Sequence, residues 1–96
     1  MAKNKILDIK VLEKVKFEKL EFLNLNENNI SNIDILEKVN FKELKKLYLF
    51  NNKISNIKVL AKVKFEKLEL LDLENNKIHI KQKDLIISKF KSILKI

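Results

Sequence analysis

A repeat of 24 residues runs through most of this chain and restricts it to folds built by stacking copies of one unit. The units start at residues 6, 30 and 54, and the segments 6–29, 30–53 and 54–77 read ILDIKVLEKVKFEKLEFLNLNENN, ISNIDILEKVNFKELKKLYLFNNK and ISNIKVLAKVKFEKLELLDLENNK. A fourth segment, 78–96, begins in the same way and then departs from the pattern. Because one such unit cannot bury its apolar face alone, we predict a single solenoid domain over residues 1–96.

One frame of residues recurs within each unit and predicts a short strand followed by a turn. The frame reads L-x-x-L-x-L-x-x-N-x-I and is filled by Leu20, Leu23, Leu25, Asn28 and Ile30, by Leu44, Leu47, Leu49, Asn52 and Ile54, and by Leu68, Leu71, Leu73, Asn76 and Ile78. Leucines at alternate positions give a strand with one face inward, and a constant offset between units pairs these strands in parallel. The asparagine amide can satisfy backbone groups where the chain leaves the strand.

The segment after each strand changes to a spacing of three residues. Ile33, Leu36 and Val39 follow this spacing, as do Ile57, Leu60 and Val63. It suits one or two turns of α- or 3-10 helix lying on the core. Asn32 and Asn56 stand just before these segments and are good residues to start a helix. The phenylalanines Phe17, Phe41 and Phe65 then recur once per unit and are predicted to close the core.

The recurring frame resembles that of the leucine-rich repeat family and matches it at every position three times over. The resemblance implies an α/β solenoid, with short parallel strands on the concave side and short α or 3-10 helices on the convex side. It also implies that Asn28, Asn52 and Asn76 form a buried ladder. The continuation I-S-N-I-x-x-L-x-K-V resembles the intracellular-type subclass with short helical segments. That subclass usually repeats at about 22 residues, and the two extra residues here fall in K-V-x-F-x-x-L.

The composition excludes several kinds of site. Without cysteine there is no disulfide, thiolate zinc site or cysteine nucleophile, and without glycine there is no glycine-rich phosphate loop. The single histidine, His79, has no second histidine to complete a metal site, and no serine has an evident base. We therefore predict a protein that is not an enzyme and holds no cofactor or metal. No secretory signal or membrane-spanning run is visible, so a cytoplasmic location is the default expectation.

Charge is strongly positive, at +8, and all 21 basic residues are lysine. Four positions alternate in sign from repeat to repeat: Lys10, Asp34 and Lys58; Glu18, Lys42 and Glu66; Lys19, Glu43 and Lys67; and Glu21, Lys45 and Glu69. Neighbouring strands lie about 5 Å apart, so these side chains can meet and help to fix the register. A column of like charge, Lys14, Lys38 and Lys62, stands apart, with Lys16 and Lys64 beside it. The absence of arginine disfavours nucleic acid as a partner.

We expect the two ends of the solenoid to differ in structure. Residues 84–94 predict a C-terminal capping helix with Asp84 as its N-cap and an apolar face of Ile86, Phe90, Ile93 and Leu94. The alternative, a basic amphipathic helix on a membrane, is less favoured because a solenoid needs a cap. At the other end the chain begins with half a repeat. The first full strand, from Phe22 to Leu25, is therefore predicted to be a sheet edge that invites self-association.

The residues between the core leucines face the concave side and form the candidate binding surface. They are Phe22, Asn24 and Asn26 in the first repeat, Lys46, Tyr48 and Phe50 in the second, and Leu70, Asp72 and Glu74 in the third. Large apolar groups among polar ones suit a protein-binding patch with aromatic anchors and a polar rim. The family resemblance implies the same surface.

Three roles for the exposed aromatic residues stay open from the sequence. The first is a non-catalytic protein-interaction module that binds an unidentified partner through the concave face. The second is a structural unit that forms a homodimer or larger oligomer through this patch or the N-terminal edge. The third is cross-strand packing that stabilises a short sheet and carries no function of its own.

Overall fold

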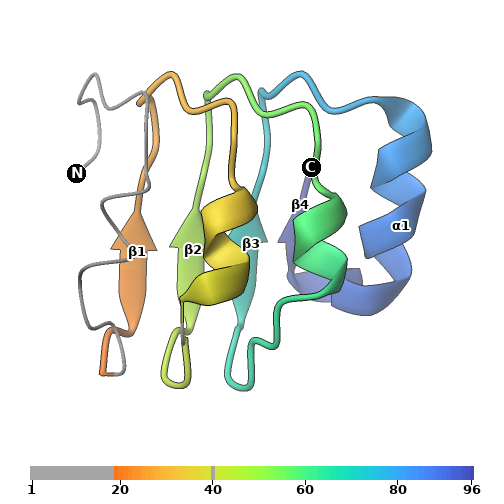
Figure 1. Cartoon of the computed structure of the whole chain (residues 1–96). Coiled ribbons are helices and arrows are strands. Elements are labelled where there is room, and N and C mark those ends of the chain that lie inside the picture. The colour runs from red at the N-terminus through yellow and green to blue at the C-terminus, as the bar shows by residue number, and fades with distance from the viewer. Residues whose placement is uncertain (1–18, 40) are drawn as a thin grey trace.

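The computed structural model describes residues 19–39 and 41–96 as one parallel sheet with helical segments on one face (Figure 1). The order along the chain is β1 (Phe22–Asn24), η2 (Asp34–Lys38), β2 (Lys46–Tyr48), η3 (Lys58–Ala61), β3 (Leu70–Asp72), α1 (Ile80–Phe90), η4 (Lys91–Ile93) and β4 (Leu94–Lys95). The η segments are 3-10 helices. This arrangement confirms the predicted α/β leucine-rich repeat solenoid.

The sheet keeps the register that the repeat predicts. Its strands lie in chain order and are parallel, and Leu23 is aligned with Leu47, which is aligned with Leu71. Each of these leucines is buried. A fourth rung, Leu94, pairs with Leu71 at an offset of 23 residues (94 − 71) rather than 24. The stacked leucines therefore form the spine of the core, as the alternation of the sequence indicates.

The helical segments close the opposite side of the core. Ile35 and Leu36 of η2, and Val59 and Leu60 of η3, are buried against the leucine spine. Asn32 and Asn56 lie one residue before the N-caps Ile33 and Ile57. Each asparagine Oδ1 accepts the backbone N–H two residues later, from Asp34 at 2.8 Å and from Lys58 at 3.1 Å. These bonds satisfy donors that the first turn of a helix leaves unpaired.

The phenylalanines line up along the solenoid. The ring centroid of Phe41 lies 5.8 Å from that of Phe65, which lies 6.2 Å from that of Phe90 on α1. Phe41 is 1% exposed and Phe65 is half-buried. Their predicted core role is confirmed, whereas Phe17 and the start of the first repeat lie outside the described residues.

The asparagine ladder connects successive turns. The Oδ1 of Asn52 accepts the backbone N–H groups of Asn28 and Ile30, each at 2.9 Å. Its Nδ2 donates to the carbonyls of Leu25 and Leu49, at 3.0 and 3.1 Å. The Oδ1 of Asn76 accepts from the N–H of Ile54 at 3.1 Å, one repeat further on. The amides thus satisfy backbone groups that leave the strands, which is the structural role predicted for them.

Asparagine also supplies the left-handed backbone of these turns in a chain without glycine. Asn51 and Asn75, at equivalent positions in two repeats, have φ angles of 58° and 56°. Asparagine tolerates this region better than most residues do. The first repeat places Glu27 at the equivalent position, with a φ of 59°. Glutamate has no such tolerance, so this turn is less well matched to its sequence.

The C-terminal cap differs from its prediction in extent. Helix α1 begins at Ile80 with His79 as its N-cap, whose Nδ1 accepts the N–H of Lys81 at 3.2 Å, so the assignment of Asp84 as N-cap was wrong. The helix ends at Phe90, and Leu94 belongs to β4 rather than to the helix. The buried residues of α1 are Ile86 and Phe90. The cap therefore consists of a helix and a returning strand.

Two polar contacts explain why α1 docks where it does. The Oε1 of Gln82 accepts the N–H of Ile57 at 2.8 Å. The Nζ of Lys89 donates to the carbonyls of Leu60 and Val63, at 2.8 and 2.7 Å, beside the end of η3. Burial lowers the pKa of Lys89. These residues tie α1 to the convex side of the third repeat.

Candidate functional site

The nine predicted surface residues come from β1, β2, β3 and the turns that follow these strands. Alternation along each strand buries the central leucine and turns its neighbours to the other face. Pairing aligns Phe22 with Lys46 and Lys46 with Leu70. The same pairing aligns Asn24 with Tyr48 and Tyr48 with Asp72. Two of the three predicted columns are thus strict cross-strand neighbours.

The third column, Asn26, Phe50 and Glu74, lies where the strands end. The N–H of Phe50 donates to the Oδ1 of Asn26 at 2.6 Å, and the N–H of Asn51 donates to the carbonyl of Glu74 at 3.0 Å. The N–H of Glu27 donates to the carbonyl of Phe50 at 2.9 Å. These bonds hold the ends of neighbouring strands together. The structure therefore places all three columns side by side.

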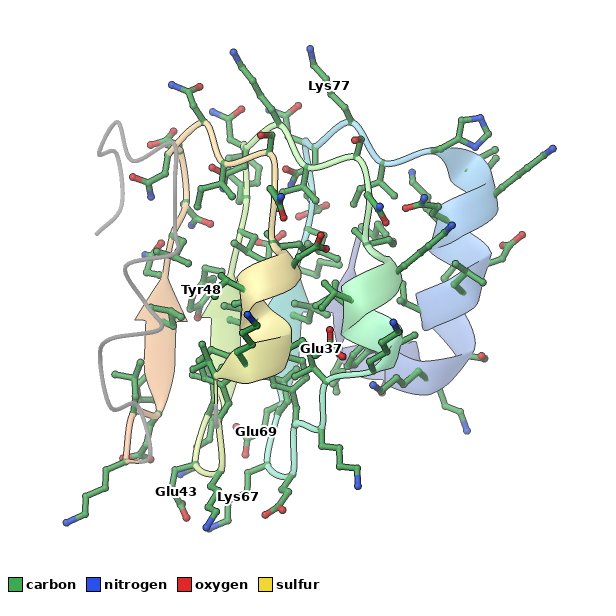
Figure 2. The ribbon with its side chains drawn as sticks, in the orientation of Figure 1. Glu37, Glu43, Tyr48, Lys67, Glu69 and Lys77 are labelled. Carbon is green, nitrogen blue, oxygen red and sulfur yellow. The ribbon has the colours of Figure 1, made fainter. Side chains whose placement is uncertain are left out.

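The apolar members of this surface are accessible to different degrees. Phe22 is 54% exposed, whereas Tyr48, Phe50 and Leu70 are half-buried. Tyr48 lies on β2, the second strand of the sheet (Figure 2). The Nζ of Lys46 lies 5.7 Å from the centroid of the Phe22 ring, a cation–π contact across β1 and β2. The patch therefore offers aromatic surface that cross-strand packing covers only in part.

The polar members are partly engaged by the backbone. The Oδ1 of Asn24 accepts the N–H of Asn26, and the Oδ1 of Asp72 accepts the N–H of Glu74, each at 3.0 Å. These bonds fix the turns and hold the side chains that frame the aromatic rings. Because these side chains are already held in place, they lose less conformational entropy when a partner binds.

Strand β4 adds a residue that the repeat pattern did not predict. Lys95 is aligned with Asp72, so it extends the second column beyond the third repeat. The sequence does contain a pattern that could have predicted this strand. Leu94-Lys95-Ile96 repeats the L-x-L pattern of the other strands, with isoleucine in place of the second leucine. The prediction missed this strand because its offset from β3 is 23 residues, whereas the repeats have a constant period of 24.

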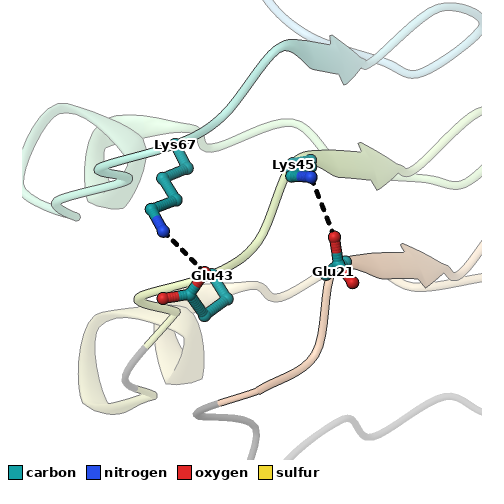
Figure 3. A network of polar contacts seen from close by, with 4 residues as sticks. All are labelled: Glu21, Glu43, Lys45 and Lys67. Atoms are coloured by element: carbon teal, nitrogen blue, oxygen red, sulfur yellow. Dashed lines mark hydrogen bonds and ion pairs between the residues drawn. The ribbon is translucent and has the colours of Figure 1, made fainter.

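Ion pairs join the loops that lead into the strands (Figure 3). The Nζ of Lys45 lies 2.9 Å from Glu21 Oε1, and the Nζ of Lys67 lies 2.8 Å from Glu43 Oε2. The hydrogen bond from Lys67 lowers the pKa of Glu43, and the hydrogen bond to Glu21 raises the pKa of Lys45. Two of the four alternating columns therefore form contacts.

The other two alternating columns do not form contacts between their described members. No ion pair joins Asp34 to Lys58 or Lys42 to Glu66 in the described residues, and Lys10 and Glu18 lie outside them. The contacts that do form lie at the starts of the strands.

Metal-binding clusters and membrane-spanning helices do not occur in the part of the chain that the structure describes. Over residues 19–39 and 41–96, no group of three or more His, Cys, Asp or Glu side chains gathers into a metal-binding arrangement. None of the helices in those ranges has the length and apolar character needed to cross a bilayer. His79, the single histidine, is exposed and serves as the N-cap of α1.

Comparison with models of protein families identifies a repeat family in the chain. The family model described as Leucine Rich repeats (2 copies) matches residues 18–62 and again residues 42–88. Together the two matches cover residues 18–88, which is more than half of the chain. They span the three asparagine rungs and most of α1. The curated proteins contain no match to the chain.

Proposed function

Because the chain belongs to the leucine-rich repeat family, whose domains generally bind other proteins, we propose that it is a non-catalytic interaction module. A protein partner binds the concave face formed by Phe22, Asn24, Asn26, Lys46, Tyr48, Phe50, Leu70, Asp72 and Glu74. Its absence of catalysis and its cytoplasmic location stay predictions from the sequence.

The exposed aromatic surface of the open sheet face carries this proposal. Helices η2 and η3 lie on one face of the sheet and bury its core leucines (Figure 1). Phe22 and Tyr48 alternate with these leucines along their strands and turn to the other face. Aromatic residues are enriched where protein interfaces concentrate their binding energy, and a polar rim excludes water from them. Phe22, 54% exposed beside Lys46, is the most accessible anchor.

The test compares capture of a partner by two matched double variants. Tyr48→Ser with Phe50→Ser removes the central rings, whereas Leu85→Ser with Ile87→Ser removes two apolar side chains of α1 that are 49% and 45% exposed. Affinity capture from the native cell should lose a protein with the first pair and keep it with the second. Equal capture by both pairs would refute the concave site.

Folding must be measured alongside capture, because Tyr48 and Phe50 are half-buried. Urea unfolding of the first pair should remain one cooperative transition. If the fold is lost, the rings have a packing role and the proposal fails for them. Phe22→Ser provides the second variant, since its exposed ring contributes less to packing, and it should weaken capture without loss of the fold.

Self-association is the second candidate, and the charges of the same face favour it. The face carries Lys46 and Lys95 together with Asp72 and Glu74, so it holds both signs within one patch. Two copies in opposite orientation can pair these charges around the aromatic rings, which is how a two-fold interface complements itself. Sedimentation over a concentration series showing monomer throughout would rule this out.

A further inference from the structure

A groove lies on the helical side of the solenoid, between the second and third repeats. It has a volume of about 330 Å³ and an apolar floor made by Val39, Phe41 and Val63. Phe41 and Val63 are buried and Val39 is half-buried, so the floor offers a shallow apolar contact. The groove lies on the face of the sheet opposite to the concave surface.

The rim of the groove is positively charged. Lys38, Lys62 and Lys64 line it together with one carboxylate, Glu37, and all four side chains belong to exposed residues. Glu37 lies on η2 (Figure 2). Three positive charges against one negative charge leave the rim with a net charge of +2 (3 − 1).

The excess of lysine on this rim differs from the alternating charges at other repeat positions. Lys38 and Lys62 occupy the same position in consecutive repeats, while the four alternating columns change sign at each repeat. In the described part of the chain, neither Lys62 nor Lys64 takes part in an ion pair. An acidic group placed beside Lys62 and Lys64 therefore gains favourable electrostatic contacts.

We propose that this groove is a second binding site, which takes an acidic peptide segment of a protein partner. Carboxylates of the peptide lie against Lys38, Lys62 and Lys64, and one aliphatic side chain lies on Val39 and Val63. The site is separate from the concave face, so it does not depend on the function proposed above.

The chemistry of the groove favours a peptide over nucleic acid or a membrane. Single strands of nucleic acid bind through exposed aromatic rings, whereas Phe41 is 1% exposed. The apolar residues of the floor are buried or half-buried, so they do not insert into a bilayer.

The test measures binding of a fluorescent peptide in which glutamates flank a single leucine. Lys62→Glu with Lys64→Glu reverses two charges of the rim. Lys53→Glu with Lys77→Glu makes the same change in net charge at exposed residues that do not line the groove, and Lys77 lies on a loop away from η2 (Figure 2). The rim variant should bind at least about tenfold more weakly, whereas the control should lose no more than about twofold.

Three further measurements test whether the peptide binds in the groove. They separate this binding from attraction to net charge, from binding at the concave face and from binding of a different ligand. Replacement of the peptide's leucine by glycine should weaken binding, and the Tyr48→Ser, Phe50→Ser protein should bind the peptide as the unaltered chain does. Equal losses in the two charge variants would overturn the proposal, because they indicate attraction to net charge alone. Competition by single-stranded DNA or by phosphatidylserine vesicles at lower concentration than the peptide would overturn it in favour of those ligands.

Discussion

Asn52 is the central amide of the ladder, and its replacement by alanine tests how much the ladder contributes to stability. The substitution removes an acceptor of two backbone N–H groups, from Asn28 and Ile30, and a donor to the carbonyls of Leu25 and Leu49. Asn52 is 5% exposed and its partners lie in the buried part of the turn, so water cannot readily replace it. The alanine variant keeps the backbone and leaves these groups without their partner.

The magnitude follows from the two N–H donors, because a carbonyl tolerates the loss of one bond better than an N–H does. A buried group left unpaired costs about 1–3 kcal/mol, so two donors cost roughly 2–6 kcal/mol. A domain of 96 residues has a total stability of roughly 5–14 kcal/mol. We expect a loss of about 3 kcal/mol, in the lower half of the range, because the turn can relax around alanine.

The assay is urea unfolding followed by circular dichroism, with Asn56→Ala as the matched control. Asn56 is exposed, and its Oδ1 accepts one N–H, from Lys58 at 3.1 Å. Its loss should cost less than about 1 kcal/mol. Asn76→Ala should fall between the two, since Asn76 is half-buried. If Asn52→Ala were within about 0.5 kcal/mol of the control, the amides would not act as the buried ladder described.

Three other perturbations test the fold and its electrostatics. Glu27→Asn should stabilise the chain by about 1 kcal/mol in urea unfolding, because asparagine tolerates the φ of 59° that glutamate holds there. The hydrogen bond from Lys67 should hold the pKa of the Glu43 carboxyl below the ordinary glutamate value by NMR, and Lys67→Met should raise it. Because the folded pKa of Glu43 is lowered, the pair's stabilisation is present above the ordinary glutamate pKa and is lost as the pH falls through the lowered value. Deletion of residues 94–96 should cost about 1–3 kcal/mol and expose the Leu73 N–H, which donates to the Lys95 carbonyl at 2.7 Å, to hydrogen exchange.

Each of these three predictions can be contradicted by a specific result. Destabilisation by Glu27→Asn would show that the glutamate side chain matters more than its backbone angle. An unchanged Glu43 titration in Lys67→Met would mean that the ion pair does not persist in solution. Unaltered exchange at Leu73 after the deletion would show that β4 does not protect the edge of β3.

The repeated elements could be read from the sequence because the information for each is local. Apolar residues at every second position predicted the strands, and apolar residues three apart predicted the short helices. The constant offset between repeats predicted the register that aligns Leu23, Leu47 and Leu71. The same alternation predicted that Tyr48 and Phe50 face away from the core leucines. In each case a short stretch of chain encodes the outcome, and its recurrence removes the ambiguity that a single short strand leaves.

The accessibility of the candidate site depended on neighbours that no repeat specifies. Phe22 is much more exposed than Tyr48, which has a paired strand on either side. The convex groove is likewise a product of packing, since its floor joins Val39 of one repeat to Val63 of the next. The sequence marked its lysine column as unusual but could not show a hollow beside it.

The sequence by itself determined the repeating rungs, the ladder and the parallel register of the strands, because equivalent neighbours impose equivalent local conditions. Only the tertiary structure decided how the solenoid ends. Helix α1 follows its N-cap His79 and docks on the third repeat through Gln82 and Lys89, which find partners at Ile57, Leu60 and Val63. Residues 94–95 become a strand because the edge of β3 offers them backbone partners. A terminal segment has no repeating neighbour to set its conformation, so the surface on which it docks decides it.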